Sequence, residues 1–275
     1  MRAQENGHGF RFSLSRLIPS LRGGMSMLAL ALTLGMGASQ AKAAVLLGPD
    51  DFEAGSSANW APNNDGPNWS VDGSSEVGNK FFKRVASSTA WADAPGASSY
   101  GDVSVQAQVR INSWNASTQN RVYIFARYTG STPSASSAYQ VSIAPDSTIS
   151  IERRAANKVI TTLATAHFMD VVGGNWNAGT WNMVRLEVSG QSPVKLAAYV
   201  NGVQIMTATD SIGVTGTGAV GFGSAGASAD FDDVTVGDGA SFSGPESGEL
   251  AHLSTPADMP MVCALTPSAT NEKGL

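Results

Sequence analysis

The segment from Gly173 to Val236 decides the fold class of this chain. It contains G-G-N-W-N-A-G-T-W-N-M-V-R-L-E-V-S-G (173–190), A-A-Y-V-N-G (197–202), G-A-V-G-F-G (218–223) and F-D-D-V-T-V (231–236). Gly, Asn and Asp turns separate short alternating runs at regular spacing, which is typical of an all-β sandwich. The segment therefore predicts two packed antiparallel sheets and excludes a helical or α/β fold.

The same pattern extends towards the N-terminus, and residues 44–237 are predicted to form one domain without internal repeats. Val103–Ile111 alternates apolar and polar residues almost perfectly, as a strand with one buried face must. Gly, Pro, Asn or Ser clusters bound most of the candidate strands. These strands are Phe81–Val85, Val103–Ile111, Arg121–Tyr128, Ala138–Ala144, Thr148–Arg154, Trp181–Val188, Leu196–Val200, Ala219–Phe222 and Phe231–Val236.

The two ends of the chain differ from this domain. Residues 1–43 combine four arginines, an apolar run at 25–38 and Ala41-Lys42-Ala43, and so predict a signal peptide and a secreted protein, extracellular or periplasmic. A membrane anchor is disfavoured because the apolar run is shorter than the ~20 residues that span a bilayer. Residues 238–275 are rich in Gly, Ser, Pro and Glu and predict a flexible tail, which contains the single cysteine, Cys263.

The charge of the predicted mature chain excludes several classes of partner. Five of the 17 basic and one of the 22 acidic residues lie in the leader, which leaves 12 and 21 and a formal charge of −9. Nucleic acids and anionic membranes need a basic field, so neither is expected as the main partner. Zinc is excluded too, because His167 is the only histidine between residues 44 and 236 and that region has no cysteine.

The order of these motifs resembles a known family. A Trp-led strand at 181, an N-G hairpin at 201–202 and a closing F-D-D-V resemble the last strands of concanavalin A-like, laminin-G-like jelly rolls. With D-D-F-E at 50–53 and the central hairpin at 126–154, the chain is similar to accessory modules of secreted exo-inulinases and pectate lyases. The resemblance implies a two-sheet antiparallel jelly-roll sandwich that binds a polysaccharide or oligosaccharide, although these motifs specify the fold better than the ligand.

A candidate glycan groove follows from the pleat of the strand at 121–128. Val122, Ile124 and Ala126 point to one side, which is predicted to be the core. Aromatic and guanidinium groups on the other side suit sugar stacking and hydrogen bonding. An alternative remains, in which this is a solvated sheet face with cross-strand ion pairs. The candidate groove residues are Arg121, Tyr123, Arg127, Gln140, Glu152 and Arg154, with Phe125 on the same face and Tyr139 in the core.

Three tryptophans are predicted to differ in their positions, two in loops and one in the core. Trp114 and Trp176 lie in polar loops, where a large aromatic has less packing reason to exist, so both are candidates for sugar stacking. The alternative is that they cap the open end of the core. Trp181 begins a strand in the pattern G-x-W-x-x-V-x-L-x-V and is predicted to be a core residue.

Acidic residues gather at the first and last strands of the domain. In related sandwiches these strands run side by side, which would bring Asp51, Glu53, Asp232 and Asp233 together. Carboxylate oxygens are ligands that Ca²⁺ prefers, and the resemblance supports a structural calcium ion. The alternative is a set of solvent-exposed acids.

Hydrolase motifs are missing, and the sequence favours a protein that is not an enzyme. The E-x-D-x-x-E strand of laminarinase-type jelly rolls is absent. A lyase that cleaves uronic-acid polymers by β-elimination is the alternative, with Arg127 or Arg154 neutralising the carboxylate and Tyr123 or Tyr139 as base. Against it, the Q-[IV]-H of alginate lyases is here Gln140-Val141-Ser142, and Y-x-K-x-G-x-Y does not occur. The third possibility is an adhesion or structural protein that binds no sugar.

Overall fold

The computed structural model describes residues 44–63, 66–74, 76–86, 91–115, 120–214 and 216–239. The predicted leader, the predicted tail and Cys263 lie outside these ranges. Within them strands predominate, helices are few and short, and all strand pairs are antiparallel. No helix of this described part is long and apolar enough to cross a membrane.

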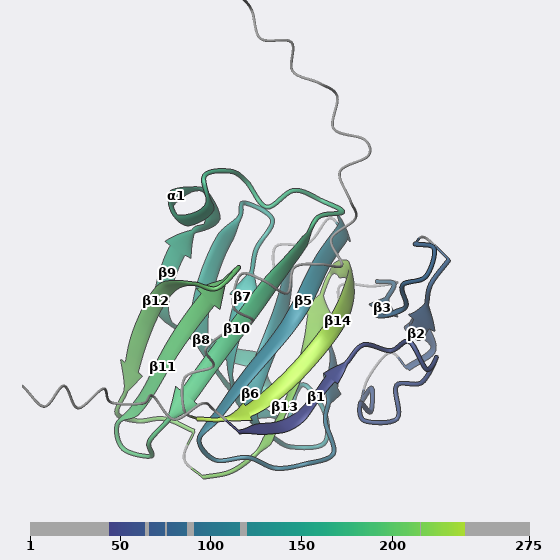
Figure 1. Ribbon diagram of the computed structural model, residues 1–275. Helices are drawn as coiled ribbons and strands as arrows, with labels where there is room; N and C mark the ends of the chain where they lie inside the picture. Colours follow the sequence, from purple (N-terminus) through teal and green to yellow (C-terminus); the bar gives the residue numbers. More distant parts are fainter. Residues whose placement is uncertain are drawn as a thin grey trace, which may run out of the picture. The chain divides into compact units, whose positions relative to one another are not determined.

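Two sheets pack face to face (Figure 1), as the sequence predicts. The eight-stranded sheet has the order β12 (Val203–Asp210), β11 (Val194–Val200), β10 (Trp181–Ser189), β5 (Val103–Trp114), β14 (Ala227–Asp238), β3 (Phe81–Arg84) and β2 (Trp69–Asp72), with β1 (Val45–Asp50) also paired to β14. The six-stranded sheet has the order β4 (Trp91–Pro95), β13 (Ala219–Ala225), β6 (Arg121–Thr129), β7 (Ser137–Ile143), β8 (Thr148–Ala155) and β9 (Val159–His167). The helices are η1 (Gly66–Asn68), η2 (Ala156–Lys158) and α1 (Phe168–Val172).

All nine predicted strands are present. The turn residues between them have the backbone angles that their residue types favour. The N-G pair is an example: Asn201 and Gly202 have positive φ angles of 49° and 81°, and Val200 pairs with Val203 across them. This is the geometry that a two-residue hairpin requires. The prediction missed β2, β4, β9 and β12. It also expected the first strand to open with Asp50–Glu53, whereas β1 ends at Asp50.

The main core lies between the sheets and follows the period-two pattern. Val105, Ala107 and Val109 of β5 face inwards, opposite Val122 and Ile124 of β6, and all five are buried. The face assigned to Val122, Ile124 and Ala126 is therefore confirmed.

An aromatic cluster fills one end of the core. The Phe222 and Phe231 rings stack with their centroids 4.4 Å apart, and Trp60 lies 4.9 Å from Phe222. Trp69 contacts the same two phenylalanines at 6.1 Å. These contacts join β2, β13 and β14, which belong to different sheets, so the cluster holds the sandwich together at this end.

Candidate functional site

The structure brings most of the predicted groove residues to one face, the outer face of the six-stranded sheet. Phe125 pairs with Gln140, and Gln140 pairs with Glu152 on the next strand. Arg121 and Tyr123 share the parity of Phe125, and Arg154 shares that of Glu152, so these side chains project to the same side. The juxtaposition expected from the pleat is confirmed for Arg121, Tyr123, Gln140, Glu152 and Arg154.

Most of this face is buried, however, and here the expectation of an open groove is wrong. Tyr123 and Phe125 are fully buried in a second hydrophobic cluster that also contains Trp91, Tyr128, Ala138 and Ala225. Arg154 is fully buried as well, and its guanidinium carbon lies 5.4–5.8 Å from four of these aromatic rings. Its aromatic neighbours therefore pack around a cation of the protein itself.

A buried ion pair fixes the centre of this cluster. Arg154 Nη1 and Nη2 donate to Asp93 Oδ1 and Oδ2 at 3.1 and 2.8 Å, and both side chains are fully buried. Tyr123 Oη donates to Asp93 Oδ1 at 2.7 Å. Burial, followed by the proximity of Asp93, raises the pKa of Tyr123 well above its usual value. Tyr123 therefore stays protonated at neutral pH and is not placed to act as a base.

Two glycines of β13 make room for the aromatic rings. A Cβ atom on Gly221 would lie 2.7 Å from Phe125 Cζ, and one on Gly223 would lie 2.7 Å from Tyr123 Cε2. The rings of β6 therefore lie across β13, towards Trp91 and Asp93 of β4. The alternating glycines of G-A-V-G-F-G were a sequence signal of this packing, because a glycine inside a strand marks a close approach.

Arg127 does not lie on this face, and its assignment to the groove is wrong. A β-bulge shifts the pairing between Ala126 and Thr129, and Arg127 has a positive φ of 52°. The extra residue turns Tyr128 into the aromatic cluster in place of Arg127. The Arg127 side chain instead joins loops: it donates to Gly101 O (2.9 Å), Val214 O (3.2 Å), Asp102 Oδ1 (3.1 Å) and Gly190 O (2.6 Å).

A polar group borders the buried cluster. Arg121 Nη1 donates to both oxygens of Glu152 at 2.9 and 3.0 Å, and Gln140 Nε2 donates to Glu152 Oε2 at 2.7 Å. The Arg121 side chain is 22% exposed. Gln140 Oε1 and Arg121 Nε are buried and lack a hydrogen-bond partner within the described ranges. We call Arg121, Gln140 and Glu152 the polar triad.

Trp114 and Trp176 are partly buried and pack against the main core. Trp176 lies 5.1 Å from Phe168 of α1, and its backbone N–H donates to Ser147 Oγ at 3.1 Å. A shift in the pairing of β5 with β14 brings Trp114 opposite Ala227, which is a core residue. Both positions match the alternative interpretation, in which the tryptophans cap the core.

Trp181 is not a core residue, and that prediction is wrong. Val184, Leu186 and Val188 of β10 are in the core, and Trp181, an odd number of residues away, points outwards from the eight-stranded sheet. There its ring lies 5.7 Å from Phe81 and 4.4 Å from the guanidinium carbon of Arg110. The spacing W-x-x-V already indicates this, because residues three apart in a strand point to opposite faces.

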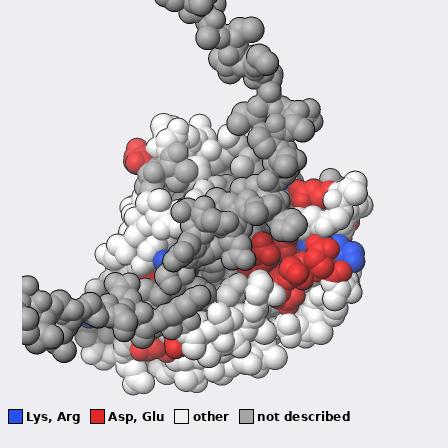
Figure 2. Space-filling model, viewed as in Figure 1, with Lys and Arg blue, Asp and Glu red and all other residues white. Residues whose placement is uncertain are grey.

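Three of the predicted calcium ligands lie near one another, as the pKa of Asp232 indicates, since it is raised by burial and then by the charges of Asp233 and Glu53. Asp51 Oδ1 accepts from the Glu53 N–H at 3.1 Å, and Glu53 Oε1 accepts from the Lys80 N–H at 2.7 Å. Asp232 Oδ1 accepts from the N–H of exposed Asp233 at 2.8 Å, and burial raises the pKa of Asp232 to about 8. β1 and β14 do run side by side, and Figure 2 shows acidic side chains gathered on this side of the molecule. Among the described residues, no group of three or more His, Cys, Asp or Glu is arranged to hold a metal ion.

The other candidate base of the lyase alternative is also unavailable. Tyr139 is buried in the main core, where its hydroxyl donates to Asp210 Oδ2 and accepts from the Val214 N–H, both at 3.0 Å. Burial, followed by the hydrogen bond to Asp210, raises the pKa of Tyr139 to about 12. The phenol therefore stays protonated at neutral pH.

Comparison with solved structures gives relatives of the same fold. A carbohydrate-binding module, CBM66 from Bacillus subtilis, has 15% identity and a TM-score of 0.51, covering 66% of this chain and 96% of that chain. A Bacillus subtilis protein of unknown function with a galectin-like fold has 13% identity and a TM-score of 0.52, covering 72% and 97%. A Bacteroides ovatus mixed-linkage glucan GH16 protein, in complex with a G4G4G3G product, has 10% identity and a TM-score of 0.50, covering 68% and 97%.

These similarities confirm the concanavalin A-like jelly-roll fold, and at such low identity they show the fold alone. No curated protein matches the chain. A family model does match it, over residues 50–237, which is most of the domain described above. The chain therefore belongs to the family of the 3-keto-alpha-glucoside-1,2-lyase-like domain.

Proposed function

We propose that the protein recognises a carbohydrate through the polar triad on the outer face of the six-stranded sheet. The observation that carries this proposal is the pair of unmet hydrogen-bonding atoms, Gln140 Oε1 and Arg121 Nε, next to the carboxylate of Glu152. A family named after a glucoside and a fold similar to that of a carbohydrate-binding module support the same class of ligand.

Sugar hydroxyls suit this arrangement because each can donate and accept a hydrogen bond. A buried polar atom without a partner costs about 1–3 kcal/mol. Gln140 Oε1 and Arg121 Nε have no exposed surface, so a ligand hydroxyl gains that energy only when the partly exposed Arg121 side chain moves aside to admit it. Hydroxyl side chains continue along the same face, since buried Ser142 pairs with buried Ser150, and Ser150 pairs with exposed Thr165 at the edge.

We expect glycan binding to weaken at least tenfold in Arg121→Ala and also in Thr165→Val. The first substitution removes a donor fork, and the second removes an exposed hydroxyl without changing the size of the side chain. Binding would be measured by calorimetry against a panel of neutral and acidic polysaccharides. Lys195→Ala, an exposed change on the other sheet, is the control. If Arg121→Ala fails to fold, Thr165→Val decides; unchanged affinity in that variant would refute the site.

The second candidate function is an elimination reaction on a 3-keto-glucoside, favoured by the family model that matches residues 50–237. In such a reaction the C2 proton leaves, the C1–C2 double bond forms, the C1–O bond breaks and the alcohol departs protonated. The product is a conjugated enone that absorbs in the ultraviolet. Absorbance of the protein mixed with a 3-keto-disaccharide tests this candidate directly.

The uronate lyase remains the alternative of lower rank, because both candidate tyrosines are buried and protonated. Pectate, alginate and glucuronan belong in the same absorbance assay, and we expect no gain with them. A protein that binds no glycan and produces no absorbance would correspond to the third possibility, an adhesion or structural protein. Secretion stays a prediction, since the leader lies outside the described residues.

Calcium binding also stays a prediction, and chelation tests it. If Asp51, Glu53, Asp232 and Asp233 share Ca²⁺, excess chelator should lower the melting temperature, because an ion bound only by the folded state stabilises it by ~2.7 kcal/mol at a hundredfold excess over Kd. Adding calcium back should restore the melting temperature, and Asp232→Asn should lose the response. An unchanged melting curve in excess chelator would contradict the prediction of a structural calcium ion.

A further inference from the structure

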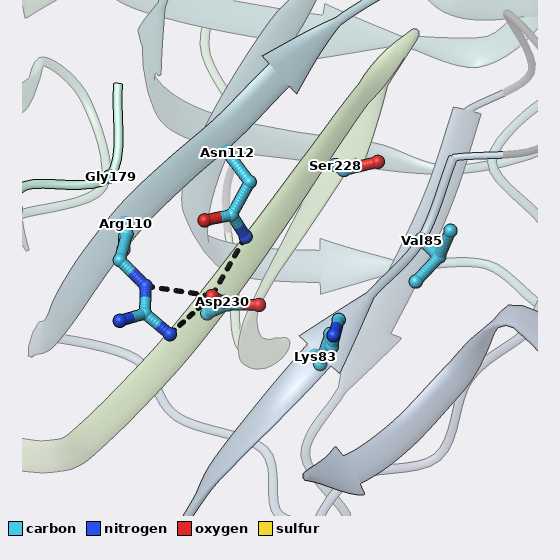
Figure 3. Close-up of a pocket in the computed structure, with 7 residues that line it drawn as sticks. All are labelled: Lys83, Val85, Arg110, Asn112, Gly179, Ser228 and Asp230. Atoms are coloured by element: carbon cyan, nitrogen blue, oxygen red, sulfur yellow. Dashed lines mark hydrogen bonds and ion pairs between the residues drawn. The ribbon is translucent and has the colours of Figure 1, made fainter. Parts of the chain in front are cut away.

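A pocket of about 370 Å³ lies on the outer face of the eight-stranded sheet, away from the polar triad. Side chains of β3, β5 and β14 line it (Figure 3), and it falls in the ~300–1,000 Å³ range of small-molecule sites. The outer faces of the two sheets point in opposite directions, so one sugar residue cannot contact both. Asp230 begins the acidic run at the start of the last predicted strand, but nothing in the sequence pattern indicates a pocket there.

The carboxylate of Asp230 is held firmly on one oxygen and unsatisfied on the other. Oδ2 accepts from Arg110 Nε, Arg110 Nη2 and Asn112 Nδ2, each at 2.8 Å. Oδ1 is buried and has no hydrogen-bond partner in the described part of the chain, although the residue is only 1% exposed. Figure 3 shows the second oxygen directed away from Arg110, towards the side where Lys83 and Val85 lie.

The surroundings keep this carboxylate in place. The Arg110 guanidinium carbon lies 4.6 Å from the Phe81 ring and 4.4 Å from the Trp181 ring, and Arg110 also pairs with Glu76. Trp181 Nε1 donates to the same Glu76 carboxylate at 3.1 Å. The floor of the pocket is therefore preorganised, which lowers the entropic cost of binding.

The chemistry of the lining selects the class of ligand. An unsatisfied carboxylate oxygen needs a hydrogen-bond donor and repels an anion. Lys83 and Arg110 are already paired with Asp72, Glu76 and Asp230, so their charges do not oppose a cation, but the described residues include no group of three or more His, Cys, Asp or Glu arranged to hold a metal ion. A neutral hydroxyl is suitable, because it can donate a hydrogen bond and carries no charge. Ser228 Oγ accepts from the Ala86 N–H at 2.9 Å and keeps its own proton to donate, and Val85, 47% exposed, offers an apolar contact for C–H groups.

We propose that this pocket is a second carbohydrate site, which binds one residue of a neutral sugar with a hydroxyl donating to Asp230 Oδ1. The proposal shares its ligand class with the proposed function but depends on a separate set of residues. It predicts two independent contacts with a glycan, one on each outer face of the sandwich.

The test uses methyl α-glucoside and a set of neutral disaccharides, with binding detected by saturation-transfer NMR and affinities by titration. We expect Asp230→Asn and Val85→Trp each to weaken binding at least tenfold, the first by changing the acceptor and the second by filling the pocket. Val203→Trp places the same side chain at another exposed position of this sheet and should leave binding unchanged.

The outcomes separate this site from the polar triad. Loss of neutral-sugar binding in Val85→Trp, with binding kept in Arg121→Ala and Thr165→Val, supports the second site. Loss in the triad variants alone would overturn it and leave the proposed function standing. Absence of neutral-sugar binding to the wild-type chain would also overturn it, while acidic polysaccharides would still test the triad. Should Asp230→Asn unfold the domain, Val85→Trp decides.

Discussion

Replacing Arg154 with alanine is expected to destabilise the domain by about 3–5 kcal/mol. The change removes one partner of a fully buried ion pair and leaves the Asp93 carboxylate without its cation, which typically costs that much. Chemical denaturation of the wild type and the variant measures the difference. An exposed groove arginine, as the sequence predicts, would instead change stability by less than ~0.5 kcal/mol.

The matched control replaces both partners of the ion pair. In Arg154→Met combined with Asp93→Leu no buried charge is left alone, and such double replacements are often neutral or stabilising. We therefore expect the double variant to recover part of the lost stability, less the ~1–3 kcal/mol that the buried Tyr123 hydroxyl costs without its carboxylate acceptor. If Arg154→Ala melts like the wild type, the outer face of the six-stranded sheet is open to water, and the buried cluster described above is wrong.

Phe222→Ala is expected to have an effect of similar size, about 3–5 kcal/mol, as is usual for a buried phenylalanine. Its ring stacks on Phe231 and contacts Trp60 and Trp69, so truncation leaves a cavity where the two sheets meet. The neighbouring aromatics are large and cannot collapse into that space easily. The loss would appear as a lower denaturation midpoint without a change in the denaturant slope.

Ile212→Ala is the control for this truncation, because Ile212 is 80% exposed and should change stability by less than ~0.5 kcal/mol. The comparison separates the destabilisation caused by a buried cavity from the effect of removing apolar atoms at the surface. Equal melting of Phe222→Ala and wild type would mean that the aromatic cluster does not hold the sheets together.

Local sequence determined the strands and the core face of this protein. Alternation in Val103–Ile111 and at Val122, Ile124 and Ala126 fixes which side chains are buried between the sheets, because a strand has a period of two residues. The N-G turn fixes a hairpin for an equally local reason, since both residues accept positive φ angles. Strands with weaker alternation or fewer residues, such as β4 at Trp91–Pro95, were not predicted.

Tertiary structure alone decided what lies on the outer faces. The bulge at Arg127 exchanges that residue with Tyr128, and it depends on the pairing of β6 with β7. Arg154 finds Asp93 61 residues away, and Arg110 finds Asp230 120 residues away. When a carboxylate and a guanidinium lie so far apart in the chain, the sequence pattern does not predict that they form an ion pair. Their meeting depends on strand order and register, which is why the sequence predicts the sandwich but not the closed cluster or the pocket.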